Sequence, residues 1–229
     1  MIQRIAVAIA LAFAPAVFAQ TYIVPDGNCG AVTFHTTRGT GFPALGEPIA
    51  ADQVADAHVY LGHQIVAVTP VAAPRSLDFN AQIPDSGVVM ASVEFKPVVS
   101  DNETRTEHAK AFVFCGAKAP IADWQAATRL AFEIIPQSWN GSMPLKPGAT
   151  MRFIAVEKGR NKLIPDIPME LYRAGAGLVG EGVLAQYGGM NFPYAEPGRY
   201  MVKATYRRPD PKQPEHWLVD TSTLTFEMK

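Results

Sequence analysis

Short segments rich in β-branched and aromatic residues recur along the whole chain, and this feature constrains its fold most strongly. Each segment is bounded by Gly, Pro, Asn or Asp, and the turn signals return roughly every 8–12 residues. The pattern predicts strands at 31–37, 87–95, 110–114, 130–135, 150–156, 200–206 and 223–228. Helical periods are few, the best being a helix over 119–131 and a helical turn at 51–57. We therefore expect an all-β protein built from antiparallel sandwiches.

The length of 229 residues allows one large domain or two domains of about a hundred residues each. We predict two β-sandwich domains, at 20–118 and 129–229, with the boundary within 116–128. Pro197-Gly-Arg-Tyr200 precedes an alternating strand, a turn common in immunoglobulin-like and transthyretin-like modules. The second domain is therefore predicted to be immunoglobulin-like or transthyretin-like. Residues 207–214 contain three prolines and are expected to form a surface loop between the last two strands.

The amino-terminal segment has the pattern of a secretory signal. Arg4 precedes an apolar run, and the small residues Val17 and Ala19 occupy positions −3 and −1 of a cleavage site before Gln20. The run is shorter than the roughly 20 residues that a spanning helix needs, and no second run follows. We expect 1–19 to be a signal peptide and the mature protein to be periplasmic, with no membrane span.

Charge and motif content argue against several functions. The 20 basic and 21 acidic side chains give a formal charge of −1, so no basic excess favours nucleic acid as a partner. No hydrolase motif and no glycosidase-like pair of carboxylates is evident. The glycine-rich stretch 175–180 lacks the strand and helix of a dinucleotide-binding fingerprint and is expected to be a hairpin loop. These observations favour a non-enzymatic protein over an unrecognised hydrolase.

Two cysteines, Cys29 and Cys115, both fall in the expected first domain, and each is followed by glycine. Disulfides persist in an oxidising compartment, and no third cysteine competes for either thiol. We expect a Cys29–Cys115 disulfide, the alternative being two buried free thiols on different strands.

Histidines are the main candidates for metal ligands. On one uninterrupted strand, His58 and His63 would face opposite sides, so only a hairpin turn at Gly62 could bring them together. His35 and His108 lie on predicted strands of the same expected domain. We take this pair as the candidate metal site, with solvated strand residues as the alternative.

Six motifs, in their order and spacing, resemble a known family. They are Tyr22-Ile-Val-Pro25, Gly39-Thr-Gly-Phe-Pro43, the stretch 105–116 ending in Phe-Cys-Gly, Leu130-Ala-Phe-Glu-Ile-Ile-Pro136, Leu145-Lys-Pro-Gly148 and Glu196-Pro-Gly-Arg-Tyr200. Together the motifs are similar to the exported domain-of-unknown-function family 4198, once labelled a nickel-transport family. The resemblance extends over essentially the whole mature chain.

The resemblance implies a periplasmic binding or accessory protein that serves metal or metal-chelate uptake. The ligand would be a metal ion, a metal chelate or non-covalent haem, and the partner an outer-membrane receptor or an inner-membrane transport component. Many members begin the mature chain with His, whereas this one is expected to begin with Gln20, which lacks the imidazole that a terminal metal site would use. The alternative function is a structural or adhesion-type module that binds protein or glycan through its loops.

Overall fold

The computed structural model describes residues 19–62, 64–82, 87–115, 128–138, 150–158, 160–183, 189–193 and 196–228. These residues form strands and one short 3-10 turn, η1 (Ala51–Gln53), which confirms the all-β prediction. The strands of the first half are β1 (Gln20–Asn28), β2 (Ala31–Gly39), β3 (Val54–Leu61), β4 (Gln64–Ala67), β5 (Val71–Ala73), β6 (Ser76–Gln82), β7 (Gly87–Phe95), β8 (Val98–Val99) and β9 (Glu103–Cys115). Those of the second half are β10 (Phe132–Ser138), β11 (Thr150–Glu157), β12 (Arg160–Leu163), β13 (Pro168–Arg173), β14 (Gly177–Val183), β15 (Met190–Pro193), β16 (Gly198–Asp210) and β17 (Gln213–Met228).

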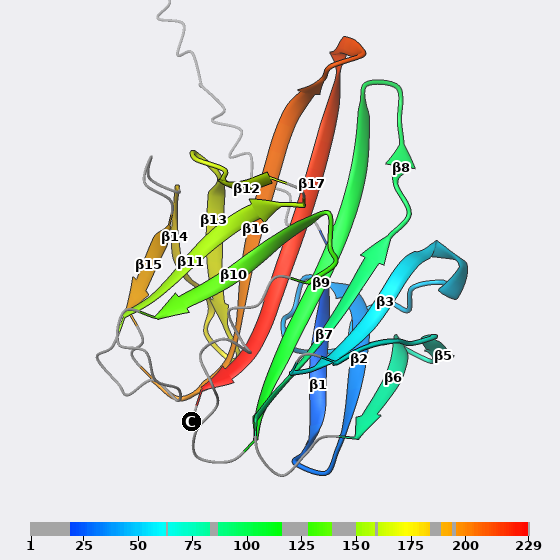
Figure 1. The fold of residues 1–229 in the computed structure, drawn as a ribbon, viewed down its shortest axis with the longest axis vertical. Coiled ribbons are helices and arrows are strands. Elements are labelled where there is room, and N and C mark those ends of the chain that lie inside the picture. Colours follow the sequence, from blue (N-terminus) through cyan, green and yellow to red (C-terminus); the bar gives the residue numbers. More distant parts are fainter. Residues whose placement is uncertain are drawn as a thin grey trace, which may run out of the picture.

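The strands form three sheets, which Figure 1 shows from the side. A central sheet has the order β14-β13-β16-β17-β9-β7-β3-β4, with the short β8 paired to β9. An outer sheet of order β1-β2-β6-β5, here called the N-sheet, packs on one of its faces. The C-sheet, of order β10-β11-β12 with β15 paired to β11, packs on the other face.

Two hydrophobic cores lie on opposite faces of the central sheet because side chains alternate along each strand. On β7, Val89 and Ala91 belong to the core under the N-sheet, whereas Val88 and Met90 belong to the core under the C-sheet. Both cores contain fully buried aromatic and aliphatic side chains. The sandwich prediction is therefore confirmed, with the central sheet shared by both sandwiches.

The central sheet crosses the sequence position where we expect a domain boundary. β9 and β17 pair in parallel from Glu103↔Trp217 to Ala111↔Thr225, so strands from both halves of the chain join in one sheet. Residues 116–127 lie outside the described residues. The division into 20–118 and 129–229, and the immunoglobulin-like or transthyretin-like character of the second part, stay predictions.

All seven predicted strands are present, and β7 has the predicted bounds of 87–95. The expected loop at 207–214 is wrong in extent, since β16 continues to Asp210 and β17 begins at Gln213. The guanidinium of Arg207 lies 4.0 Å from the ring centre of Trp217 and packs across this extended ribbon. The helical turn expected at 51–57 is limited to η1, and most of the helix expected over 119–131 lies outside the described residues.

Candidate binding site

His35 lies on β2 and belongs to a polar cluster of the N-sheet. Its Nδ1 is 2.8 Å from Oδ1 of Asp78, and its Nε2 is 3.9 Å from Oδ2 of Asp26. The hydroxyl of Ser76 also donates to Oδ1 of Asp78, at 2.6 Å. Because neighbouring Phe34 belongs to the core under the N-sheet, strand alternation places His35 on the opposite, outer face.

His108 is buried on β9 between the central sheet and the C-sheet. Its Nδ1 is 3.5 Å from Oε2 of Glu94, and its Nε2 is 3.3 Å from Oδ1 of Asp220. Arg208 donates to the other oxygen of Asp220 at 2.5 Å and is 3.4 Å from Oε1 of Glu157 on β11. We call His108, Glu94, Asp220 and Arg208 the His108 cluster, which ties the C-sheet to the central sheet.

The charges of the His108 cluster shift the pKa of its members. Burial by itself lowers the pKa of His108, but the interactions with Asp220 and Glu94 outweigh it and raise that pKa above 6.5. The interaction with His108 lowers the pKa of Glu94. The pKa of Asp220 is also lowered, because His108 and Arg208 together outweigh the effect of its burial. The folded protein thus favours a protonated His108 between two carboxylates.

The raised pKa of His108 predicts a loss of stability at alkaline pH. Above pH 6.5 the unfolded chain releases this proton while the folded protein retains it, so the free energy of unfolding falls as pH rises through the folded pKa. Chemical denaturation between pH 6 and pH 9 is expected to show this decline in the parent and to lose it in His108→Gln. His216→Gln is the control, at a histidine whose Nε2 lies 2.9 Å from the hydroxyl oxygen of Thr104, and it should keep the decline. A His108→Gln variant with an unchanged slope would contradict the prediction.

The two histidines predicted as metal ligands do not meet in the structure. His35 faces outward from the N-sheet, whereas His108 faces the C-sheet from the middle layer, and each has its own carboxylate partners. The cause is the alternation of their strands, which turns the two rings toward different layers. Across the described ranges, no group of three or more His, Cys, Asp or Glu side chains could hold a metal ion.

The hairpin turn that the sequence left open at Gly62 is present between β3 and β4. A turn containing Gly62, with φ +59°, joins β3 to β4, as a hairpin there requires. His63 lies outside the described residues, and His58 is buried with Nδ1 3.4 Å from Oδ2 of Asp56.

Cys29 and Cys115 form the predicted disulfide, with their Cα atoms 5.5 Å apart.

A buried ion pair links Lys110 on β9 to Glu133 on β10, with Nζ and Oε2 2.9 Å apart. Glu133 also accepts hydrogen bonds from the backbone N–H and the hydroxyl of Thr128. Sequence reasoning missed this pair, although the signal was available. Each residue is a single charge within an apolar strand, Ala109-Lys-Ala-Phe112 and Phe132-Glu-Ile-Ile135. The pair fixes the start of the C-sheet against the central sheet.

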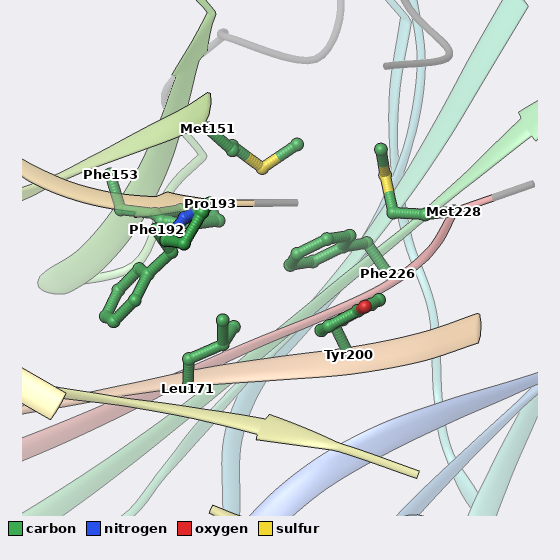
Figure 2. Close-up of a pocket in the computed structure, with 8 residues that line it drawn as sticks. All are labelled: Met151, Phe153, Leu171, Phe192, Pro193, Tyr200, Phe226 and Met228. Atoms are coloured by element: carbon green, nitrogen blue, oxygen red, sulfur yellow. The ribbon is translucent and has the colours of Figure 1, made fainter. Parts of the chain in front are cut away.

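A narrow apolar slot lies between the C-sheet and the central sheet (Figure 2). It has a free volume of about 20 Å³, enough for one small apolar group. In Figure 2 the side chains converge on it from the strands of both sheets. The lining residues are Met151, Phe153, Leu171, Phe192, Pro193, Tyr200, Phe226 and Met228.

The strand β14 forms one edge of the central sheet, next to β13 (Figure 1). A Cβ atom added to Gly180 would be 3.0 Å from the ring of Phe192 and 3.8 Å from Leu171, both of which line the slot. Leu178, Val179 and Val183 of β14 are 49%, 46% and 58% exposed. Within the described part of the chain, β14 pairs with β13 alone. Apart from Glu181, the side chains of this edge strand are apolar or absent, and the strand carries neither Pro nor Lys, two of the residues that protect such edges.

A second groove, of about 520 Å³, lies at β5, the edge strand of the N-sheet. It is lined by residues 68–73 and 78–80 without Pro70. Its edge strand β5 has only three residues, between Pro70 and Pro74. Proline at both ends limits the backbone hydrogen bonds that a docking strand could make. The edge at β14 is thus the better candidate for strand pairing.

No protein-family model matches the chain, and no curated protein matches it. A solved structure that does match concerns host cell surface retention of a 1.5-MDa bacterial ice-binding adhesin. The sequences are 10% identical and the TM-score is 0.28, with 93% of this chain and 66% of that chain covered. This chain thus spans just under two thirds of the matched one. Among the described residues, no helix is long and apolar enough to cross a membrane.

Proposed function

We propose that this protein is an exported, non-enzymatic binding module that takes an extended polypeptide segment along β14. The exposed apolar edge of β14 is the observation that supports the proposal. Three of the eight large apolar side chains that are exposed in the described residues lie on this one strand. A concentration of exposed apolar side chains on one edge strand is a feature of interaction sites.

The mode of binding follows from the chemistry of a sheet edge. An added strand gains backbone hydrogen bonds from the edge, and its alternate side chains find pockets on the adjoining face. β13 and β14 are in regular register from Leu171↔Gly180 to Pro168↔Val183, and a register shift follows between Leu171 and Tyr172. The added segment would pair along Gly180–Val183, and the apolar slot would take one of its side chains.

The metal-related expectation has less support than polypeptide binding. Membership of family 4198, periplasmic location and metal or metal-chelate uptake with a membrane partner stay proposals that rest on the sequence resemblance. The placement of His35 and His108 on different layers gives the pair no shared ligand position. Polypeptide binding is therefore our leading proposal.

A peptide titration tests the proposal. The probe is an end-blocked seven-residue peptide of alternating Thr and Val with a central Lys, added to mature protein labelled with ¹⁵N and at the methionine methyl groups. We expect shifts at the amides of Gly180–Val183 and at the methyl groups of Met151 and Met228, which line the slot. Val183→Lys should weaken binding about tenfold or more, since it places a flexible charge beside the apolar edge.

Val71→Lys is the matched control, because Val71 is an exposed valine on the edge strand β5 of the N-sheet. It should leave binding of the peptide unchanged. A peptide N-methylated at alternate residues should not bind, since it cannot form the backbone ladder. The proposal fails if no shifts occur at β14, or if Val71→Lys weakens binding and Val183→Lys does not.

A further inference from the structure

We infer that the segment bound along β14 carries a basic residue opposite Glu181. This inference rests on the proposed function and adds the chemical character of the partner. The evidence is a row of charged side chains that crosses the end of the central sheet and stops at its edge.

The row runs across three neighbouring strands. Lys203 of β16 stands opposite Glu170 of β13, and Glu170 stands opposite Glu181 of β14. Directly opposed residues share a face of the sheet and lie close enough for their side chains to interact. The sequence of charges from the interior to the edge is therefore positive, negative, negative.

The first carboxylate of the row is already satisfied. Nζ of Lys203 is 3.0 Å from Oε2 of Glu170, and the hydroxyl of Tyr172 donates to the same oxygen at 2.5 Å. Burial of Tyr172, with its hydrogen bond to Glu170 and the charges of Glu170 and Glu181, raises the pKa of its hydroxyl. Tyr172 therefore stays a proton donor to Glu170, and it supplies no positive charge to Glu181.

The second carboxylate is exposed and lies opposite a like charge, an arrangement that is destabilising in a sheet. In the part of the chain that the structure describes, no cation forms an ion pair with Glu181. A strand added to β14 would place one side chain opposite Glu181 on this same face. A Lys or Arg at that position would place a positive charge directly opposite Glu181 and offset the repulsion from Glu170.

The charge of β14 argues against a second copy of this chain as the occupant. Glu181 is the one charged residue in Gly177–Val183. An antiparallel pair of β14 strands, related by a two-fold axis, would therefore bring two carboxylates near each other without a cation. A different polypeptide with a basic residue fits the edge better.

Three versions of the peptide of alternating Thr and Val test the inference. They differ only in the central residue, which is Lys, Gln or Glu. We expect the Lys peptide to bind about two- to fivefold more tightly than the Gln peptide, as an exposed ion pair provides. The Glu peptide should bind more weakly than the Gln peptide. The difference between Lys and Gln should shrink in 1 M salt, where charges are screened over about 3 Å.

Glu181→Gln should abolish the preference for Lys while it retains binding of the Gln peptide, and Glu227→Gln, at an exposed carboxylate on β17, should leave the preference intact. Equal binding of the three peptides by the parent would overturn the charge inference and leave strand addition standing. Binding of none of them would overturn the proposed function itself. Concentration-dependent dimerisation through β14, with no binding of peptide, would instead favour a second copy and also overturn the inference.

Discussion

Replacement of Lys110 by methionine is expected to lower the free energy of unfolding by about 3–5 kcal/mol. The ammonium group is fully buried 2.9 Å from Oε2 of Glu133, which is also buried. Methionine is similar in length and fills the space, but it leaves the carboxylate of Glu133 without this cation. Removing one partner of a buried ion pair has a cost of this size because an uncompensated charge remains. Chemical denaturation at neutral pH measures the effect.

The double variant Lys110→Met with Glu133→Gln separates charge burial from lost packing. It removes both charges and keeps an amide oxygen that can accept from the backbone of Thr128. We expect the double variant to be more stable than Lys110→Met alone, since residues in one ion pair are strongly coupled. Additive losses, or a loss below about 1 kcal/mol for Lys110→Met, would show that the pair does not hold the C-sheet in this way.

The all-β fold was predictable because local patterns determine strands. The nearly continuous apolar run at 87–95 gives β7, and each of its faces is apolar because the central sheet is covered on both sides. The way the strands are ordered into sheets was not predictable. The parallel pairing of β9 with β17 joins residues more than a hundred positions apart, and no local signal records it. The extended β16–β17 ribbon was missed because prolines suggested a loop, whereas Pro209 is accommodated next to a register shift.

The candidate site was less predictable than the fold. His35 and His108 were correctly placed on strands, but the sheet to which each strand belongs decides which way its side chains face. The edge position of β14 also depends on sheet order, so the glycine-rich stretch 175–180 suggested only a hairpin loop, whereas β14 begins at Gly177. A Cβ atom added to Gly182 would be 1.9 Å from the methyl carbon of Met190, so a larger residue there would displace the Met190 side chain, a contact that sequence alone does not reveal. Long-range packing therefore determines which residues form the site.

Loss of the Cys29–Cys115 disulfide is the second change with a large expected effect. Cys29 lies in the turn between β1 and β2, and Cys115 is the buried last residue of β9. The bond therefore fastens the N-sheet to the central sheet and closes a loop with a sequence separation of 86. In the chain-entropy model, such a loop stabilises the folded protein by about 4–5 kcal/mol, because the cross-link restricts the unfolded chain.

The variant with alanine at both cysteines should therefore unfold at a lower denaturant concentration than the oxidised parent. Alanine suits the fully buried position of Cys115, where serine would bury a hydroxyl group. A reducing agent should lower the stability of the parent toward that of the variant and leave the variant unchanged, which separates loss of the bond from loss of side-chain packing. Two reactive thiols per chain in the unfolded, unreduced parent would contradict the disulfide. Equal stability of the oxidised parent and the variant would instead contradict its fastening of the two sheets, since the bond would then add nothing to the packing of β1 and β2 on β9.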